Sequence, residues 1–324
     1  MTLAIFHSPA EWSARFGAGG KRTVVTVGNF DGVHRGHQEI LRRVAERARA
    51  EGALAAVVTF DPHPLRVLRP ADAPQMLLTV AQRLAAFDAA KMDAALVLKF
   101  DAALAQLSAE DFVRQILVET LRANAILVGE TFRFGHRQAG NVALLRKFGA
   151  TWNFAVECIE PVVCRGIVVS STTIRNAVRE GNLLLAGRLL GRPYALSGEI
   201  RTGTGQGREL VVPTLNLQTE QELLPKTGVY ATEAVVDGRT YRAVTNVGVR
   251  PTFGGKGVTV ESYLFDFERE MKHGPLAVRF WARLRDEMKF SGPEALRAQI
   301  LRDAARAQQF FRLLNRPNLR KQSA

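Results

Sequence analysis

The chain has 324 residues, a formal net charge of +13 at pH 7 and two cysteines. That length is enough for two domains with separate hydrophobic cores. No apolar run approaches the ~18 residues of a membrane span, and no hydrophobic stretch near the N-terminus resembles a secretory signal. We therefore predict a cytoplasmic protein with no membrane partner, whose Cys158 and Cys164 stay reduced and bind no metal.

Two interpretations of the positive charge are open. A basic protein can bind nucleic acid, or it can favour small polyanionic substrates. The arginines are dispersed over predicted helices and the C-terminal half, and no block of five basic residues occurs. We interpret most of them as solvated helix faces and expect no nucleic-acid partner.

Val24–Leu41 has the clearest local pattern. The run Val24–Val27 predicts a buried strand, and three glycines then predict a tight turn into a helix: Gly28, Gly32 and Gly36. His34 and His37 stand three residues apart where the helix begins, so both face one side of its first turn. Unpaired N–H groups and the positive end of the helix dipole attract phosphate there. This segment therefore predicts a site for the oxygens of a nucleotide triphosphate.

The rest of the first half alternates strands with helices. Apolar runs predict strands at Ala53–Phe60, Ala94–Phe100, Ala125–Gly129, Phe154–Cys158 and Gly166–Val169. Amphipathic stretches predict helices over Gln38–Ala50, from Thr79, from Ser108 and over Ile174–Arg179. This alternation predicts an α/β fold with a parallel sheet covered by helices on both faces. Ligands of such sheets bind beyond the carboxyl ends of the strands, where the sequence places Gly28–His37, Phe60–Pro64, Gly129–Gly135 and Ser170–Arg175.

Side chains in these loops allow two interpretations. Phe60, Phe132 and Phe134 are either core residues or include a ring that stacks on a flat ligand. The hydroxyls of Ser171 and Thr172 either cap a helix or, together with Arg175, bind phosphate.

The composition changes near residue 191. Gly191–Pro193 breaks the last helix, and a β-rich half follows with predicted strands at Gly228–Val236, Arg239–Val247, Val258–Phe265 and Leu276–Leu284. Asp237-Gly238 predicts a hairpin turn, and the short strands predict a small antiparallel barrel. A long amphipathic helix is expected over Pro293–Leu314. We thus predict two domains, 1–190 and 191–324.

Thr214 and Asn216 are candidate metal ligands in this barrel. In an extended segment their side chains point to the same side, and a hydroxyl with an amide oxygen can bind Mg²⁺ that carries ATP phosphates. Glu261 lies in a later predicted strand and could take the proton from an attacking hydroxyl. Without further context, Pro-Thr-x-Asn favours a plain turn.

Two segments of the first half resemble known signatures. Gly28–His37 is similar to the H-x-G-H signature of nucleotidylyltransferases, and Ser170–Arg175 resembles their S-S-T-x-I-R signature. Together with the barrel segments, their order resembles that of the bacterial bifunctional riboflavin kinase/FMN adenylyltransferases, the prokaryotic FAD synthetases. Further segments agree in the same order: Thr59–Pro62, Val128-Gly129 with Phe132–Gly135, Leu190–Tyr194, Pro213–Asn216, Gly228–Tyr230, Asn246–Gly248 with Arg250–Phe253, and Lys289-Phe290.

The resemblance implies two reactions. The C-terminal barrel would phosphorylate riboflavin with MgATP to give FMN, with Glu261 as base and Gly207, Arg208, Thr214 and Asn216 binding ATP and Mg²⁺. The N-terminal Rossmann-like domain would transfer AMP from ATP to FMN, giving FAD and pyrophosphate, with His34 and His37 as catalytic residues. FAD could then pass to flavoprotein clients. The implied ATP or phosphate contacts of this second reaction are Gly28, Phe30, Asp31, Gly36, Ser171, Thr172 and Arg175, with Phe60 and Phe132 as flavin contacts.

Some residues depart from the family pattern. Thr131 stands where Asp or Asn is usual, and His273 where Tyr is common. Val211-Val212 replaces Gly-Phe, and Ser262-Tyr263 replaces residues that usually end in His. None of these removes a proposed catalytic group. An enzyme with only one active half is an alternative, and a nucleic-acid-binding barrel, without a matching aromatic and basic motif, is another.

Overall fold

The computed structural model describes residues 2–17, 20–201, 214–252, 255–269 and 271–315. The chain forms two compact units, Met1–Val169 and Ser170–Ala324, which we call the first and the second unit. Within the described residues, no helix combines the length and the apolar character needed to cross a membrane.

The first unit is built on a six-stranded sheet with the order β1-β4-β3-β2-β5-β6, and its strand pairs are parallel. The chain runs from β2 outward through β3 and β4 and then returns to the other side of β2 as β5. The strand order therefore reverses beside β2, the position at which such sheets bind ligands. The strands are β1 (Ala4–Phe6), β2 (Thr23–Val27), β3 (Leu54–Asp61), β4 (Ala94–Lys99), β5 (Ala123–Gly129) and β6 (Ala155–Ile159).

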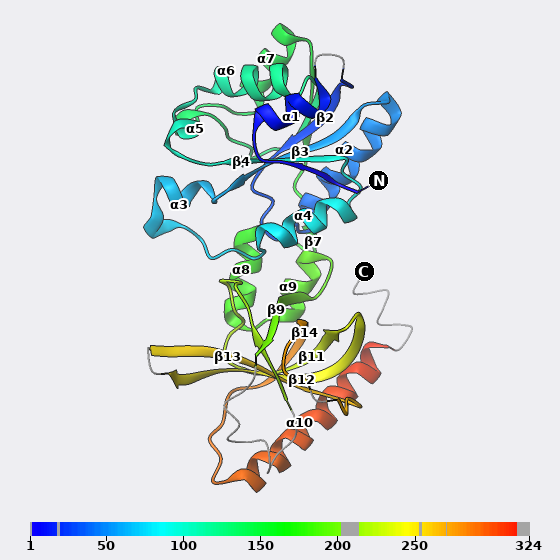
Figure 1. Cartoon of the computed structure of the whole chain (residues 1–324), viewed down its shortest axis with the longest axis vertical. Helices are drawn as coiled ribbons and strands as arrows, with labels where there is room; N and C mark the ends of the chain where they lie inside the picture. The colour runs from blue at the N-terminus through cyan, green and yellow to red at the C-terminus, as the bar shows by residue number, and fades with distance from the viewer. Residues whose placement is uncertain (1, 18–19, 202–213, 253–254, 270, 316–324) are drawn as a thin grey trace. The chain divides into compact units, whose positions relative to one another are not determined.

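Helices cover both faces of the sheet, as predicted (Figure 1). One face shares a core with α2 (Arg35–Glu51) and α4 (Val80–Ala89); the other shares a core with α1 (Pro9–Phe16), the helix η2 (Phe112–Thr120) and α7 (Val142–Trp152). Because side chains alternate along a strand, neighbouring residues of β2 belong to different cores. The shorter helices are α3 (Pro64–Leu68), α5 (Ala102–Gln106), α6 (Ala109–Asp111) and the 3₁₀ turns Pro70–Asp72 and His136–Gln138.

Two predicted elements of the first unit differ from the structure. The strand expected over Gly166–Val169 is β8 (Ile167–Val168), which pairs antiparallel with β7 (Val163–Cys164) outside the main sheet, because Arg165 and Gly166 reverse the chain with positive φ. The helix expected from Ser108 begins as α6 but continues as the π-helix η2. The Leu121 N–H accordingly donates to the Ile116 oxygen, five residues back, at 3.0 Å.

The second unit contains a closed antiparallel barrel with the strand order β10-β13-β12-β11-β14-β9. The predicted hairpin turn is confirmed, since Asp237 (φ 48°) and Gly238 (φ 73°) are both left-handed. The barrel strands are β9 (Tyr194–Arg201), β10 (Leu215–Gln218), β11 (Gly228–Val236), β12 (Arg239–Thr252), β13 (Gly255–Leu264) and β14 (Pro275–Arg285).

Two helices precede the barrel in the second unit, α8 (Ser171–Glu180) and α9 (Leu183–Leu190). Helix α9 packs against β9 and β14, and α8 packs against α9. The compact units therefore divide between residues 169 and 170, whereas the sequence predicts the domain boundary at residue 190.

The outer and inner faces of the barrel can be assigned from α10 (Pro293–Leu314). This helix shares a core with Val244 and Tyr263, so their side of β12 and β13 is the outer face. The residues next to Val244 and Tyr263 along each strand point into the barrel, because side chains alternate along a strand. Three fully buried hydroxyls form a chain across the interior, with 2.7 Å from Thr232 to Thr245 and 2.8 Å from Thr245 to Ser262.

A buried ion pair also holds α10 on the barrel. The Arg285 guanidinium of β14 donates to both carboxylate oxygens of Asp303, the closest contact being 2.7 Å, and Gln299 donates a further hydrogen bond at 3.0 Å. The Asp303 side chain is 1% exposed. Removal of one partner would leave the other charge buried without compensation.

We expect Asp303→Asn to lower the free energy of unfolding of the second unit by about 3–5 kcal/mol. Urea denaturation followed by far-UV circular dichroism measures this loss. Asp237→Asn, which removes a carboxylate from an exposed pair with Arg269, is the control and should leave the transition almost unchanged. Equal effects of the two substitutions would contradict a special role for the buried pair.

Candidate active sites

The loop that follows β2 has an unusual backbone. Phe30 (φ 49°) and Val33 (φ 37°) are non-glycine residues in the left-handed region, on either side of Gly32 (φ 85°). Such conformations persist only where the surrounding structure enforces them, and they concentrate at functional sites. Gly28 starts the loop, its N–H donating to the Val58 oxygen at 3.1 Å.

His34 and His37 come together at the end of this loop. His34 is the N-cap of α2, and its Nδ1 accepts a hydrogen bond from the backbone N–H of His37 at 3.3 Å. With Nδ1 acting as acceptor, the proton of a neutral His34 lies on Nε2. The two rings stack with centroids 3.6 Å apart and planes 17° from parallel. The predicted juxtaposition of two imidazoles at a helix start is thus present.

Gly36 makes room for this arrangement. A Cβ atom at residue 36 would lie 3.3 Å from Cε1 and Nδ1 of the His34 ring, which is closer than ordinary contact. The glycine therefore lets the His34 ring lie against the first turn of α2.

Burial lowers the pKa of His37 well below the usual 6.5, and the neighbouring His34 lowers it further. Within the described part of the chain, Nδ1 of His37 is buried and has no hydrogen-bond partner. His37 is therefore neutral at pH 7 in the free protein.

Two loop residues predicted to contact ATP have buried side chains. Phe30 is 3% exposed, and its ring packs edge-on against Phe87 of α4 and against His37. The Asp31 carboxylate accepts from the backbone N–H groups of Leu77 at 3.0 Å and Leu78 at 3.2 Å. These contacts favour a role in shaping the loop over the predicted direct contact with phosphate.

The aromatic candidates Phe60 and Phe132 are both half-buried. Phe60 lies near the end of β3, and its ring lies edge-on to that of Phe100 with the centroids 5.8 Å apart. Phe132, after β5, stacks on the buried Phe134 at 5.3 Å. Both pack on the same core and retain exposed surface, so the core interpretation and the stacking interpretation are both compatible with their positions.

Sequence reasoning missed a polar group beneath these loops. Arg83 of α4 is 2% exposed, and it donates to the Asn29 oxygen at 2.8 Å and to the Phe60 oxygen at 3.2 Å. Asn29 Nδ2 lies 3.1 Å from Nε2 of His63, the N-cap of α3. The available signal was the place of Arg83 one helical turn before Phe87, on the apolar stripe of a predicted helix.

The second phosphate-binding candidate lies at the start of α8 in the second unit. Ser170 is the N-cap; its hydroxyl accepts from the Thr173 N–H at 3.2 Å and lies 2.8 Å from the Thr173 hydroxyl. Capping thus falls to Ser170, while Ser171 and Thr172 occupy the first turn. Thr172 is exposed, and Arg175 is buried one turn further on.

The kinase candidates lie on the outer face of the barrel. Glu261 of β13 is directly opposite Asn216 of β10 and also opposite Asn246 of β12, so three half-buried polar side chains form a row across three strands. Thr214 is exposed and immediately precedes β10. A Cβ at Gly248 would lie 2.5 Å from Glu287 Oε1 and 2.9 Å from Asn246 Nδ2, so this glycine leaves room beside the row. Gly207, Arg208 and the Val211-Val212 pair lie outside the described residues.

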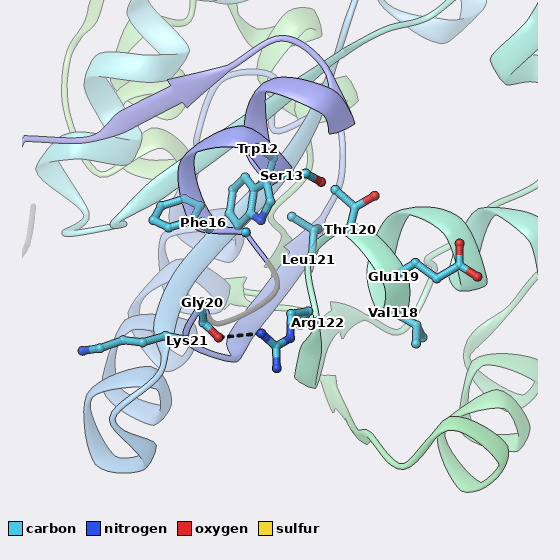
Figure 2. A pocket seen from close by; sticks show the side chains of 11 residues that line it. Trp12, Ser13, Phe16, Gly20, Lys21, Val118, Glu119, Thr120, Leu121 and Arg122 are labelled. Carbon is cyan, nitrogen blue, oxygen red and sulfur yellow. Dashed lines mark hydrogen bonds between the residues drawn. The ribbon is translucent and has the colours of Figure 1, made fainter.

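The described part of the chain holds no group of three or more His, Cys, Asp or Glu side chains suited to a metal ion. A pocket of about 600 Å³ opens in the first unit, between α1 and the end of η2 (Figure 2). Its lining includes Lys21 and Arg122, which precede β2 and β5, and the Arg122 guanidinium donates to the Gly20 oxygen at 2.8 Å. This pocket therefore lies at the amino ends of the strands, opposite the edge that carries His34.

Two family models match the chain: one described as FAD synthetase over residues 18–173 and one described as riboflavin kinase over residues 190–311. A bifunctional riboflavin kinase/FMN adenylyltransferase of Pseudomonas fluorescens is 40% identical over 285 residues, which cover 88% of this chain and 91% of that protein. The protein of that name from Escherichia coli K12 is 35% identical over 291 residues, covering 90% and 93%. A solved structure titled as a macrolide-efflux protein from Streptococcus pneumoniae covers 95% of this chain and 99% of its own, with a TM-score of 0.84 and 27% identity.

The two family models, which follow each other along an α/β domain and a barrel, identify a two-part transferase of flavin-cofactor synthesis. The chain belongs to the bifunctional riboflavin kinase/FMN adenylyltransferase family. The predicted family, fold class and order of the two activities along the chain are thereby confirmed.

We expect the imidazole of His37 to titrate below pH 6.5 in the free protein, as measured by NMR on histidine-labelled protein. Because the unfolded chain then binds this proton more readily than the folded one, the free energy of unfolding should fall as pH drops below about 6.5. His37→Gln should reduce that fall. A normal or raised midpoint for His37 would contradict the burial of its ring.

Proposed function

We propose that His34 and His37 serve the adenylyl transfer from ATP to FMN and that Glu261 serves the phosphorylation of riboflavin. The observation that carries the first assignment is the stacked imidazole pair at the N-terminus of α2, beside the reversal of strand order. The row of Asn216, Glu261 and Asn246 supports the second. FMN made by the barrel is then the substrate of the other reaction.

In the adenylyl transfer, a phosphate oxygen of FMN attacks the α-phosphate of ATP, and pyrophosphate leaves. The bond to the leaving oxygen breaks as the new P–O bond forms, so no covalent enzyme intermediate is needed. The imidazoles and the N–H groups of α2 stabilise the negative charge of the triphosphate and its leaving group. A triphosphate beside His37 would raise the pKa of its ring from the low value of the free protein, so the ring can take up a proton as the substrate binds.

The first turn of α8 is proposed to contribute phosphate-binding groups to the same reaction. Its backbone N–H groups, the Ser171 and Thr172 hydroxyls and the Arg175 guanidinium are donors of the kind that bind phosphate oxygens. Gly28 and Gly36 keep the backbone beside the histidines open, and Phe60 and Phe132 are the proposed flavin contacts.

In the phosphorylation, Glu261 accepts the proton of the ribityl hydroxyl as that oxygen attacks the γ-phosphate of ATP, and ADP leaves. The Thr214 hydroxyl and the Asn216 amide oxygen would hold Mg²⁺, since both are hard oxygen donors and Asn216 lies directly opposite Glu261. When bound, the ion would neutralise charge on the ATP phosphates.

The remaining properties follow from these two reactions. We propose a cytoplasmic enzyme whose FAD passes to flavoprotein clients, without a membrane or nucleic-acid partner. The adenylyltransferase domain would span 1–190, with α8 and α9 as its last two helices, and the kinase domain would span 191–324.

His34→Asn should abolish most FAD formation while FMN formation continues. Asparagine preserves the N-cap of α2, so the substitution removes the imidazole without removing the cap. We expect a loss of about 10²–10³-fold in kcat for FMN adenylylation, measured by chromatography of FMN and FAD after incubation with MgATP. His7→Ala, at an exposed histidine, is the control. Full FAD synthesis by His34→Asn, or loss of both products, would contradict the assignment.

Glu261→Gln should impair FMN formation and leave FAD formation from added FMN intact. Loss of a general base predicts a decrease of about 10²–10⁴-fold in FMN formation from riboflavin, while added FMN is still converted to FAD. Glu233→Gln, at a half-buried glutamate of β11, is the matched control. The same assay tests the alternative of a silent kinase half, because wild-type protein would then make FAD from FMN but not from riboflavin.

A further inference from the structure

Arg83 connects the loop after β2 to the carboxyl end of β3. Its Nη1 donates to the Asn29 oxygen at 2.8 Å, to the Thr59 hydroxyl at 3.1 Å and, with Nη2, to the Phe60 oxygen at 3.2 Å. The Thr59 hydroxyl in turn lies 3.3 Å from the Asn29 oxygen. One guanidinium thus binds the loop after β2 to the end of β3.

Burial of this charge is costly for the fold. Arg83 is 2% exposed, its acceptors are two main-chain oxygens and a hydroxyl, and within the described residues its Nε is buried without a hydrogen-bond partner. Burial lowers the pKa of Arg83, and the carboxylates of Asp31 and Asp61 offset that effect only in part. A cation so placed is expensive to retain for packing alone.

The same segment of chain holds the loop at a second point. The Asp31 carboxylate accepts from the N–H groups of Leu77 and Leu78, which lead into α4, and Arg83 lies on α4 itself. Phe30, with its left-handed backbone, stands between the two anchored residues, Asn29 and Asp31. Its ring contacts that of His37 with centroids 5.0 Å apart.

We propose that Arg83 is a positioning residue for adenylyl transfer: it fixes Asn29 and so holds Phe30, His37 and His34 in their catalytic arrangement. This inference rests on the function proposed above for the two histidines. Without Arg83, the Asn29 oxygen loses its shortest hydrogen bond, and the restraint that keeps Phe30 from relaxing toward an ordinary backbone is weakened. The His37 ring would then shift, and misplacement of a catalytic group by about 1 Å can cost about 10²-fold in rate.

The test compares Arg83→Met, which removes the charge and the donors, with Arg83→Lys, which keeps the charge on a single amine. Arg122→Met is the matched control, because Arg122 is a part-buried arginine of the same unit that donates to a main-chain oxygen at the opposite edge of the sheet. Each full-length variant is assayed with FMN and MgATP for FAD formation. Riboflavin phosphorylation by the same preparation reports on the second unit.

We expect kcat for FAD formation to fall by about 10²-fold in Arg83→Met and by less in Arg83→Lys, with the KM for ATP changed by a much smaller factor. Riboflavin phosphorylation and Arg122→Met should match wild type. A purely structural role would not move the NMR titration of His37, whereas loss of positioning should bring its midpoint closer to 6.5 in folded Arg83→Met. Unchanged kcat and an unchanged His37 titration in that variant would overturn the proposal.

If Arg83→Met does not fold, Thr59→Val tests the positioning role of Arg83. This nearly isosteric change removes the hydroxyl that lies between Arg83 and Asn29. We expect a smaller fall in kcat and less than additive effects when it is combined with Arg83→Lys; full kcat in Thr59→Val would overturn the proposal. If His34→Asn still makes FAD at the wild-type rate, the proposed function fails instead, whatever the Arg83 variants show.

Discussion

The first unit depends on one topological constraint, the reversal of strand order beside β2. Because the strands are parallel, the loops after β2 and β5 lie at one edge of the sheet, and the reversal makes β2 and β5 neighbours there, where α2 begins. The loop after β2 has a strained backbone at this edge, because Phe30 and Val33 both have positive φ. Hydrogen bonds from buried groups supply the restraint, and the apolar layers under α2 and α4 supply the rigidity.

Much of this organisation could be predicted from the sequence, because it depends on local pattern. The strand Gly228–Val236 and the helix Pro293–Leu314 agree with the structure at both ends, since turn residues and a proline mark their limits. The placement of His34 and His37 together at a helix start follows from their spacing, whereas the stacking of their rings is seen only in the structure. The π-helical course of Phe112–Thr120 could not be predicted, because an apolar stripe does not distinguish an i→i−4 from an i→i−5 ladder over so few turns.

Candidate residues that depend on tertiary contacts were harder to interpret. The motif containing Asp31 suggested a ligand contact, whereas the structure shows its carboxylate accepting hydrogen bonds from the backbone N–H groups of Leu77 and Leu78, far away in sequence. Arg83 belongs to no motif, and only the structure shows that acceptors from the loop after β2 and from the end of β3 converge on it. A sequence displays which residues are polar, but not which polar residues meet each other.

The sheet of the first unit has two edge strands, whereas the barrel of the second unit is closed. The open sheet of the first unit ends at β1, which is only three residues long, and at β6. The barrel has no free edge, because β9 and β10 pair and close the ring. Exposed main-chain groups on a sheet edge can recruit strands from other molecules. Closure therefore protects the β-rich half of the chain from intermolecular strand pairing. A charged residue or a proline is not needed for that purpose beside the Asn216–Glu261 row.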